Sequence, residues 1–116
     1  MSKPVILAVE DEVLLRIYLC DGLRDAGFTV VEAGDAREAL RVLKARSDVA
    51  LVVTDLRMPG DMDGNDLVRE IHRLYPCLKV ISVSAHQIDE PVAASVSKPY
   101  KVDDVISLIK LLLSHQ

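Results

Sequence analysis

The sequence has few aromatic residues and few cysteines. Among its 116 residues there are no tryptophans, three tyrosines and one phenylalanine, whereas half of all residues are hydrophobic. The core must therefore be built mainly from aliphatic side chains, which suits a domain of alternating strands and helices. The two cysteines, Cys20 and Cys77, are far apart and form no Cys-x-x-Cys pair. This spacing argues against a redox or zinc-binding function.

The sequence also lacks a basic patch and a long apolar run. Its 14 Lys and Arg residues are outnumbered by 18 Asp and Glu residues, for a formal charge of −4. Nucleic acid is not expected as the main partner, because phosphate contacts need clustered cations. The apolar run after Pro4 has only five residues, too short for a signal-peptide core or a membrane span. We expect a cytoplasmic protein with no membrane partner, and the length predicts a single domain over residues 1–116.

Apolar runs alternate with segments of helical periodicity along the whole chain. The pattern predicts strands at residues 4–9, 28–32, 49–54, 78–83 and 95–97, and helices at 12–26, 35–46, 64–74 and 101–114. Strands and helices that alternate in this way indicate right-handed crossovers and one doubly wound parallel sheet with helices on both faces. The predicted fold class is therefore α/β.

The last crossover is unusual because the interval 85–97 must contain both the connection and the fifth strand. Pro91 lies in the middle of this interval. A full helix needs about 11 residues, so we expect a short or irregular connection. Pro91 could open a helical turn over residues 91–94.

Polar side chains stand at the ends of four predicted strands. Glu10 and Asp11 follow the first, Asp55 follows the third, Ser84 follows the fourth and Lys98 follows the fifth. The carboxyl ends of parallel strands meet at one edge of the sheet, where ligands of open α/β sheets bind. We therefore expect these side chains to form one site.

The chemistry of this group of residues fits phosphoryl transfer assisted by a divalent cation. Carboxylates crowded together repel one another unless a cation intervenes, and oxygen ligands with room for water favour Mg²⁺. We expect Glu10, Asp11 and Asp55 to bind Mg²⁺, with the main-chain carbonyl of Arg57 completing the protein ligands. Asp55 would be the nucleophile that attacks phosphorus. The side chains expected to contact phosphoryl oxygens are those of Ser84 and Lys98.

Several of these residues also have simpler explanations. Glu10 and Asp11 could cap the first helix, whose N-terminus favours acidic side chains. Ser82 lies on the same face of its strand as Ser84, although Ser84 is nearer the edge. His86 could contact the phosphoryl group or lie in an exposed loop.

The ordered set of motifs resembles the CheY-like receiver domains of two-component response regulators, over essentially the whole chain. The motifs are Val9-Glu10-Asp11, Thr54-Asp55-Leu56-Arg57-Met58-Pro59-Gly60, Ser84-Ala85 and Ser97-Lys98-Pro99-Tyr100. The resemblance implies a five-stranded flavodoxin-like sheet in the order 2-1-3-4-5, Mg²⁺, and transfer of a phosphoryl group from a histidine kinase or histidine phosphotransferase to Asp55. It is closest to stand-alone receivers with a reduced fourth helix. Ser95 occupies the position where such domains usually have an aromatic residue.

The function expected from this resemblance is signalling through protein–protein contact, or action as a phosphate shuttle or sink. The chain would not be a conventional enzyme, although it could catalyse its own phosphorylation and dephosphorylation. Two rival functions are a small Mg²⁺-dependent phosphatase with an aspartyl nucleophile and an unphosphorylated interaction module. The phosphatase is disfavoured because Arg57 occupies the place of that class's second acid.

Three apolar residues are candidates for contact with partners. In the first helix, Leu14 and Ile17 lie off the apolar stripe formed by Leu15, Leu19, Leu23 and Ala26. We expect the kinase or phosphotransferase to dock there, next to the phosphorylation site. In the last helix, Leu111 points away from the inward stripe and is a weaker candidate for contact with an unknown downstream protein.

Overall fold

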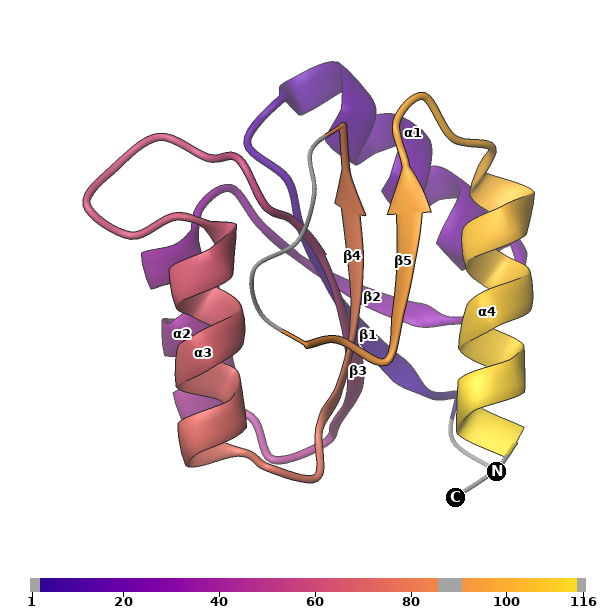
Figure 1. Cartoon of the computed structure of the whole chain (residues 1–116). Helices are drawn as coiled ribbons and strands as arrows, with labels where there is room; N and C mark the ends of the chain where they lie inside the picture. Colours follow the sequence, from indigo (N-terminus) through magenta and orange to yellow (C-terminus); the bar gives the residue numbers. More distant parts are fainter. Residues whose placement is uncertain (1–2, 86–90, 115–116) are drawn as a thin grey trace.

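The computed structural model describes residues 3–85 and 91–114. Its five parallel strands have the order β2-β1-β3-β4-β5 (Figure 1), which confirms the predicted fold class. The strands are β1 (Val5–Val9), β2 (Thr29–Ala33), β3 (Val49–Asp55), β4 (Lys79–Ser84) and β5 (Ala94–Ser97). The helices in the described part of the chain are α1 (Val13–Asp25), α2 (Ala36–Ala45), α3 (Gly64–Leu74) and α4 (Val102–Ser114). Each predicted element is present, with ends shifted by no more than one residue.

Helices cover both faces of the sheet, as Figure 1 shows, with α2 and α3 on one side and α1 and α4 on the other. Side chains of the central strands alternate between two aliphatic cores. Leu51 belongs to the core beneath α1 and α4, whereas its neighbour Val52 belongs to the core beneath α2 and α3. This double burial explains why the central strands are continuous apolar runs rather than alternating ones.

Acidic residues fix the starts of two helices. The Asp35 side chain accepts a hydrogen bond from the Glu38 backbone N–H at 2.8 Å and so caps α2. Asp63 and Asp66 form a reciprocal capping box at the start of α3. Such caps satisfy backbone N–H groups that have no partner within the helix, and they set where the chain turns back from the edge of the sheet.

The connection from β4 to β5 contains no helix in its described residues, 85 and 91–93. The helical turn suggested for residues 91–94 is wrong, because Ala94 is already the first residue of β5. The Ala93 N–H donates to the Val80 carbonyl at 2.9 Å, so the chain is already aligned with β4 at this residue. The described structure therefore agrees with a reduced fourth helix. Residues 86–90 of this interval lie outside the described residues.

In the described part of the chain, no helix is both long and apolar enough to cross a lipid bilayer.

Candidate functional site

Four strands end at the edge of the sheet where the predicted residues meet. Asp55 and Ser84 are the last residues of β3 and β4, Glu10 directly follows β1, and Lys98 directly follows β5 (Figure 1). Glu10 is 2% exposed, and Asp55 and Ser84 are each 6% exposed. Polar groups buried to this degree need partners, and the contacts between them define the site.

Lys98 joins two of the acids. Its Nζ lies 2.7 Å from Asp55 Oδ2 and 3.1 Å from Glu10 Oε1. Both carboxylates are almost fully buried, so solvent screens these ion pairs less than it would at the surface. The Lys98 backbone N–H also donates to the Ser84 carbonyl at 3.0 Å, which ties the lysine to the end of β4.

Glu10 forms hydrogen bonds through its carboxylate, its backbone N–H and its carbonyl. Its carboxylate accepts a hydrogen bond from the Glu12 backbone N–H at 3.2 Å, and its own N–H donates to the Ala33 carbonyl at 3.0 Å. The Arg16 guanidinium donates to the Glu10 carbonyl at 2.9 Å. Sequence reasoning missed this role of Arg16, because a positive residue in an exposed helix turn gives no sign of a contact with a preceding loop. Neither acid caps α1, since its N-cap residue is Glu12.

Asp55 is fixed through its side chain and its backbone. Its Oδ1 accepts a hydrogen bond from the Arg57 N–H at 3.1 Å, and its carbonyl accepts one from the Thr54 hydroxyl at 2.8 Å. Gly64 lies against this segment and donates its N–H to the Leu56 carbonyl at 3.0 Å. A Cβ on Gly64 would collide with the Asp55 carbonyl oxygen and with the Leu56 Cα. Only glycine therefore fits behind Asp55.

Three carboxylates are close enough to share one cation. Glu10, Asp11 and Asp55 each offer one carboxylate oxygen, and these atoms all lie within 4.8 Å of one another. A cluster of hard oxygen donors, one of them on a half-exposed residue, matches the preference of Mg²⁺ for few carboxylates and several waters. The residues present thus fit Mg²⁺. The Arg57 carbonyl stays a predicted ligand.

The electrostatics of the site also favour a cation. Burial raises the pKa of Glu10 to about 7, the hydrogen bond from Glu12 opposes this rise, and the negative charge of Asp55 adds to it. For Lys98, burial acts to lower the pKa, but hydrogen bonds to Asp55 and Glu10 outweigh it and raise the pKa above its usual value. The amine therefore stays positively charged, while the acids are held under mutual repulsion.

The remaining candidates occupy different surroundings. Ser84 is the last residue of β4 and lies nearer the edge than Ser82, as predicted. Ser82 is fully buried within β4, and its hydroxyl has no hydrogen-bond partner among the described residues. His86 lies outside the described residues. The Ser84 hydroxyl stays the predicted donor to a phosphoryl oxygen.

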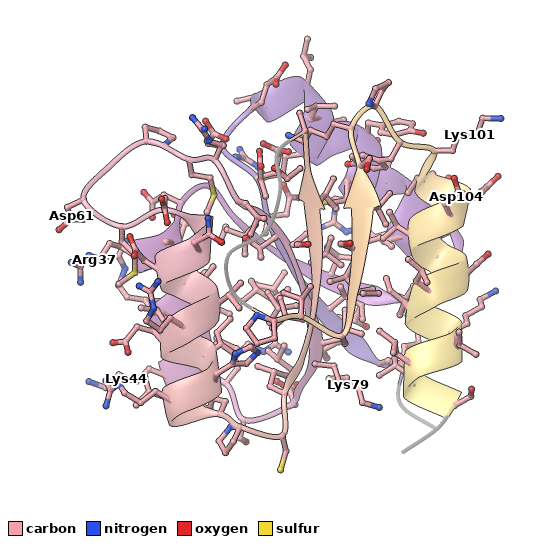
Figure 2. The ribbon with its side chains drawn as sticks, viewed as in Figure 1. Arg37, Lys44, Asp61, Lys79, Lys101 and Asp104 are labelled. Atoms are coloured by element: carbon pink, nitrogen blue, oxygen red, sulfur yellow. The ribbon has the colours of Figure 1, made fainter. Side chains whose placement is uncertain are left out.

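The loop between β3 and α3 is tied to α2. In Figure 2, Arg37 of α2 and Asp61 of the loop point toward one another, and Arg37 Nη2 lies 2.8 Å from Asp61 Oδ2. Both side chains are more than half exposed. Asp61 therefore belongs to a surface ion pair and not to the acid cluster.

The predicted docking residues are all exposed. Leu14 is 77% exposed and Ile17 is 48% exposed, and both lie in α1, the helix that follows the acidic pair. Val13 and Tyr18 extend the same exposed face. Leu111 is also exposed, but it lies toward the far end of α4 from the site (Figure 1). Only the α1 residues are adjacent to the acids.

Comparison with known proteins identifies the family. Residues 6–110 match the model described as the response regulator receiver domain. The chain belongs to the response regulator receiver domain family. Receiver domains are modules of two-component signalling, bind Mg²⁺ at an acidic pocket, and interact with histidine kinases or phosphotransferases.

Two curated relatives and one solved structure illustrate the similarity. The chain is 31% identical to the DNA-binding transcriptional regulator NtrC of Escherichia coli K12, over 99% of the chain and 26% of that protein. It is 33% identical to the sensor kinase CckA of Brucella abortus, over 99% of the chain and 13% of that protein. The structure of a CheY-like receiver domain protein from Methanospirillum hungatei superposes with a TM-score of 0.90 at 27% identity, covering 98% of this chain and 96% of that one. The chain thus spans about a quarter of the length of NtrC and a smaller share of CckA.

Proposed function

We propose that Asp55 accepts a phosphoryl group from a phosphohistidine on a histidine kinase or histidine phosphotransferase. The chain then signals by binding another protein, or acts as a shuttle or sink for the phosphoryl group. The observation that supports this most directly is the position of Asp55, which contacts Lys98 at 2.7 Å and shares the acid cluster with Glu10 and Asp11. A cytoplasmic location and a single stand-alone domain stay predictions within this proposal.

The transfer step follows from the arrangement of the side chains. An Asp55 carboxylate oxygen attacks phosphorus and forms an O–P bond, while the N–P bond to the partner's imidazole breaks and its electron pair returns to the ring nitrogen. Lys98 would neutralise charge on the phosphoryl oxygens, and the Ser84 hydroxyl would donate to one of them. Mg²⁺, held by Glu10, Asp11, Asp55 and the Arg57 carbonyl, would offset the repulsion between the acids and the incoming phosphoryl group.

Phosphorylation must rearrange the contacts of Lys98. The phosphoryl group adds roughly two negative charges and three acceptor oxygens at Asp55. Lys98 now bridges Asp55 and Glu10, so new oxygens beside Asp55 compete for the same amine. This competition is the local change that the rest of the molecule can respond to.

The rival functions fit the site less well. A phosphatase of the aspartyl-nucleophile class needs a general acid two residues after the nucleophile, and the guanidinium of Arg57 cannot donate a proton at neutral pH. A pure interaction module has no need for buried acids in contact with a lysine, an arrangement that is costly to bury. The geometry therefore favours the phosphoacceptor.

Labelling with a small phosphoryl donor tests the proposal. Incubation with acetyl phosphate and Mg²⁺ should add one phosphoryl group, seen by intact mass spectrometry, and hydroxylamine should remove it as expected for an acyl phosphate. Absence of the added mass would contradict the proposal. Sustained release of phosphate from a phosphomonoester would support the phosphatase instead.

Mg²⁺ binding should strengthen as the pH rises. Because the pKa of Glu10 is about 7, this carboxyl is mostly protonated at pH 6 and must lose its proton before it can bind a cation. We expect the Mg²⁺ affinity, measured by calorimetry at constant ionic strength, to rise about tenfold between pH 6 and pH 8. Glu10→Gln should bind Mg²⁺ more weakly and with little dependence on pH, whereas Glu12→Gln should behave like the wild type. An unchanged pH dependence in Glu10→Gln would contradict the assignment.

Leu14→Asp should slow transfer from the protein donor selectively. A charge in the exposed α1 face opposes docking, but Leu14 is 77% exposed and is not part of the acid cluster, so labelling by acetyl phosphate should be retained. The kinase or phosphotransferase is first identified by profiling transfer from purified candidates, and the transfer rate should then fall by at least about tenfold, as for loss of a docking hot spot. Leu111→Asp is the matched control and should leave both rates unchanged. Loss of both rates in Leu14→Asp would indicate misfolding.

A further inference from the structure

Two tyrosines from distant parts of the sequence are in contact beside the site. Tyr18 lies in α1, and Tyr100 lies in the segment between β5 and α4. Their ring centroids are 6.0 Å apart with an interplanar angle of 46°, within the range of favourable aromatic pairs. The contact joins two elements that border the site from different directions.

Tyr18 is also bonded to the start of α4. The Val102 N–H donates to the Tyr18 hydroxyl oxygen at 2.9 Å, and Val102 is the first residue of α4. The first N–H groups of a helix have no partner within it, so α1 supplies a cap for α4. The Val102 side chain packs against Gly22 so closely that a Cβ there would lie 2.7 Å from Val102 Cγ2. The start of α4 is thus held against α1 by a hydrogen bond and by close packing.

Tyr100 is tied to the acids through the chain itself. Only Pro99 separates it from Lys98, whose amine contacts Asp55 and Glu10. Its ring packs against the core beneath α1 and α4, and its buried hydroxyl has no hydrogen-bond partner among the described residues. Burial raises the pKa of the Tyr100 phenol, and the charge of Glu10 raises it further. The ring therefore lies within the electrostatic reach of the site.

We propose that the contact between Tyr100 and Tyr18 transmits the phosphorylation state of Asp55 to the exposed face of α1 and to the start of α4. The proposal rests on the phosphoacceptor function. When Lys98 turns toward the phosphoryl oxygens, the segment through Pro99 to Tyr100 moves with it. Tyr100 cannot move without repacking against Tyr18, and the bond from Val102 to the Tyr18 hydroxyl is then strengthened or broken. Leu14 and Ile17 lie within about one turn of Tyr18 in α1, and they report the same change to a docked partner.

Amide and ring NMR signals with and without a phosphoryl mimic test this inference. In the Mg²⁺-loaded wild type, beryllofluoride should shift the Val102 amide and the Tyr18 ring signals. Tyr18→Phe keeps the ring contact but removes the acceptor, so the shift at Val102 should fall by more than half while beryllofluoride affinity and acetyl phosphate labelling stay unchanged. Tyr100→Leu should remove the response at both positions. Tyr75→Phe, at the C-cap of α3, is the control and should respond like the wild type.

The possible outcomes separate this inference from the proposed function. Shifts at Asp55 and Lys98 without shifts at Val102 and Tyr18 would overturn the inference and leave the phosphoacceptor intact. A full Val102 response in Tyr18→Phe would also overturn it.

If Tyr100→Leu fails to fold, Tyr100→Phe is the variant that tests the inference. Its ring is kept, and the lost hydroxyl has no hydrogen-bond partner in the described part of the chain. The response must therefore persist, and its loss would overturn the inference. Absence of both labelling and beryllofluoride binding would overturn the two proposals together.

Discussion

Asp55→Asn will abolish labelling by acetyl phosphate. An amide oxygen is too weak a nucleophile to form an acyl phosphate, and the substitution also removes one of the three carboxylates gathered for Mg²⁺. The charged hydrogen bond from Lys98 at 2.7 Å becomes a weaker bond to a neutral group. Intact mass spectrometry of the variant should therefore show no phosphorylated species under conditions that label the wild type.

Asp61→Asn is the matched control for this experiment. It makes the same chemical change in the loop that follows Asp55, but Asp61 is exposed and paired with Arg37 (Figure 2). An exposed ion pair contributes little to folding stability, so labelling should match the wild type. Labelling of Asp55→Asn at a normal rate would show that another residue is the acceptor.

Gly64→Ala should destabilise the fold more than Gly60→Ala or Gly34→Ala. The new Cβ would collide with backbone atoms of Asp55 and Leu56, which cannot move aside as a flexible side chain can. We expect the free energy of unfolding, measured by urea denaturation, to fall by about 3 kcal/mol. Because the collision displaces the segment that bears the phosphoacceptor, the labelling rate of the folded fraction should fall as well.

Substitutions at two other glycines distinguish the effect of close packing from the effect of backbone conformation. Gly60 lies in the same loop with a φ of +110° and no atom within reach of an added Cβ, so Gly60→Ala should cost only about 1–2 kcal/mol of stability. At Gly34 an added Cβ would meet only the flexible Arg16 guanidinium, at 3.3 Å, and Gly34→Ala should have little effect. If Gly64→Ala were no worse than Gly60→Ala, the close approach behind Asp55 would be disproved.

Much of this protein could be predicted from local patterns. Apolar runs and helical periodicity are properties of neighbouring residues, so the elements were predicted to within one residue of their observed ends. Since parallel strands all end at the same edge, the polar residues at the ends of β1, β3, β4 and β5 were also expected to meet. The exception was the helical turn at residues 91–94, where the Ala93 N–H is paired with β4 instead.

Other features depend on how the elements pack. Nothing near Gly64 in the sequence shows that the start of α3 presses on Asp55, and nothing near Arg16 shows that it holds the Glu10 carbonyl. The contact between Tyr18 and Tyr100 joins α1 to the segment before α4. Such contacts depend on distances between elements, which periodicity leaves undetermined.

The sequence by itself determined the alternating elements, the parallel sheet and the set of acids, hydroxyl and amine at its edge, because each follows from the order of residues within a single strand or turn. Only the tertiary structure decided that Lys98 contacts both Glu10, 88 residues earlier, and Asp55, 43 residues earlier. It also decided that Gly64 must lack a side chain and that α1 caps α4. These facts arise from the close packing of elements whose separation in space is independent of their separation in the chain.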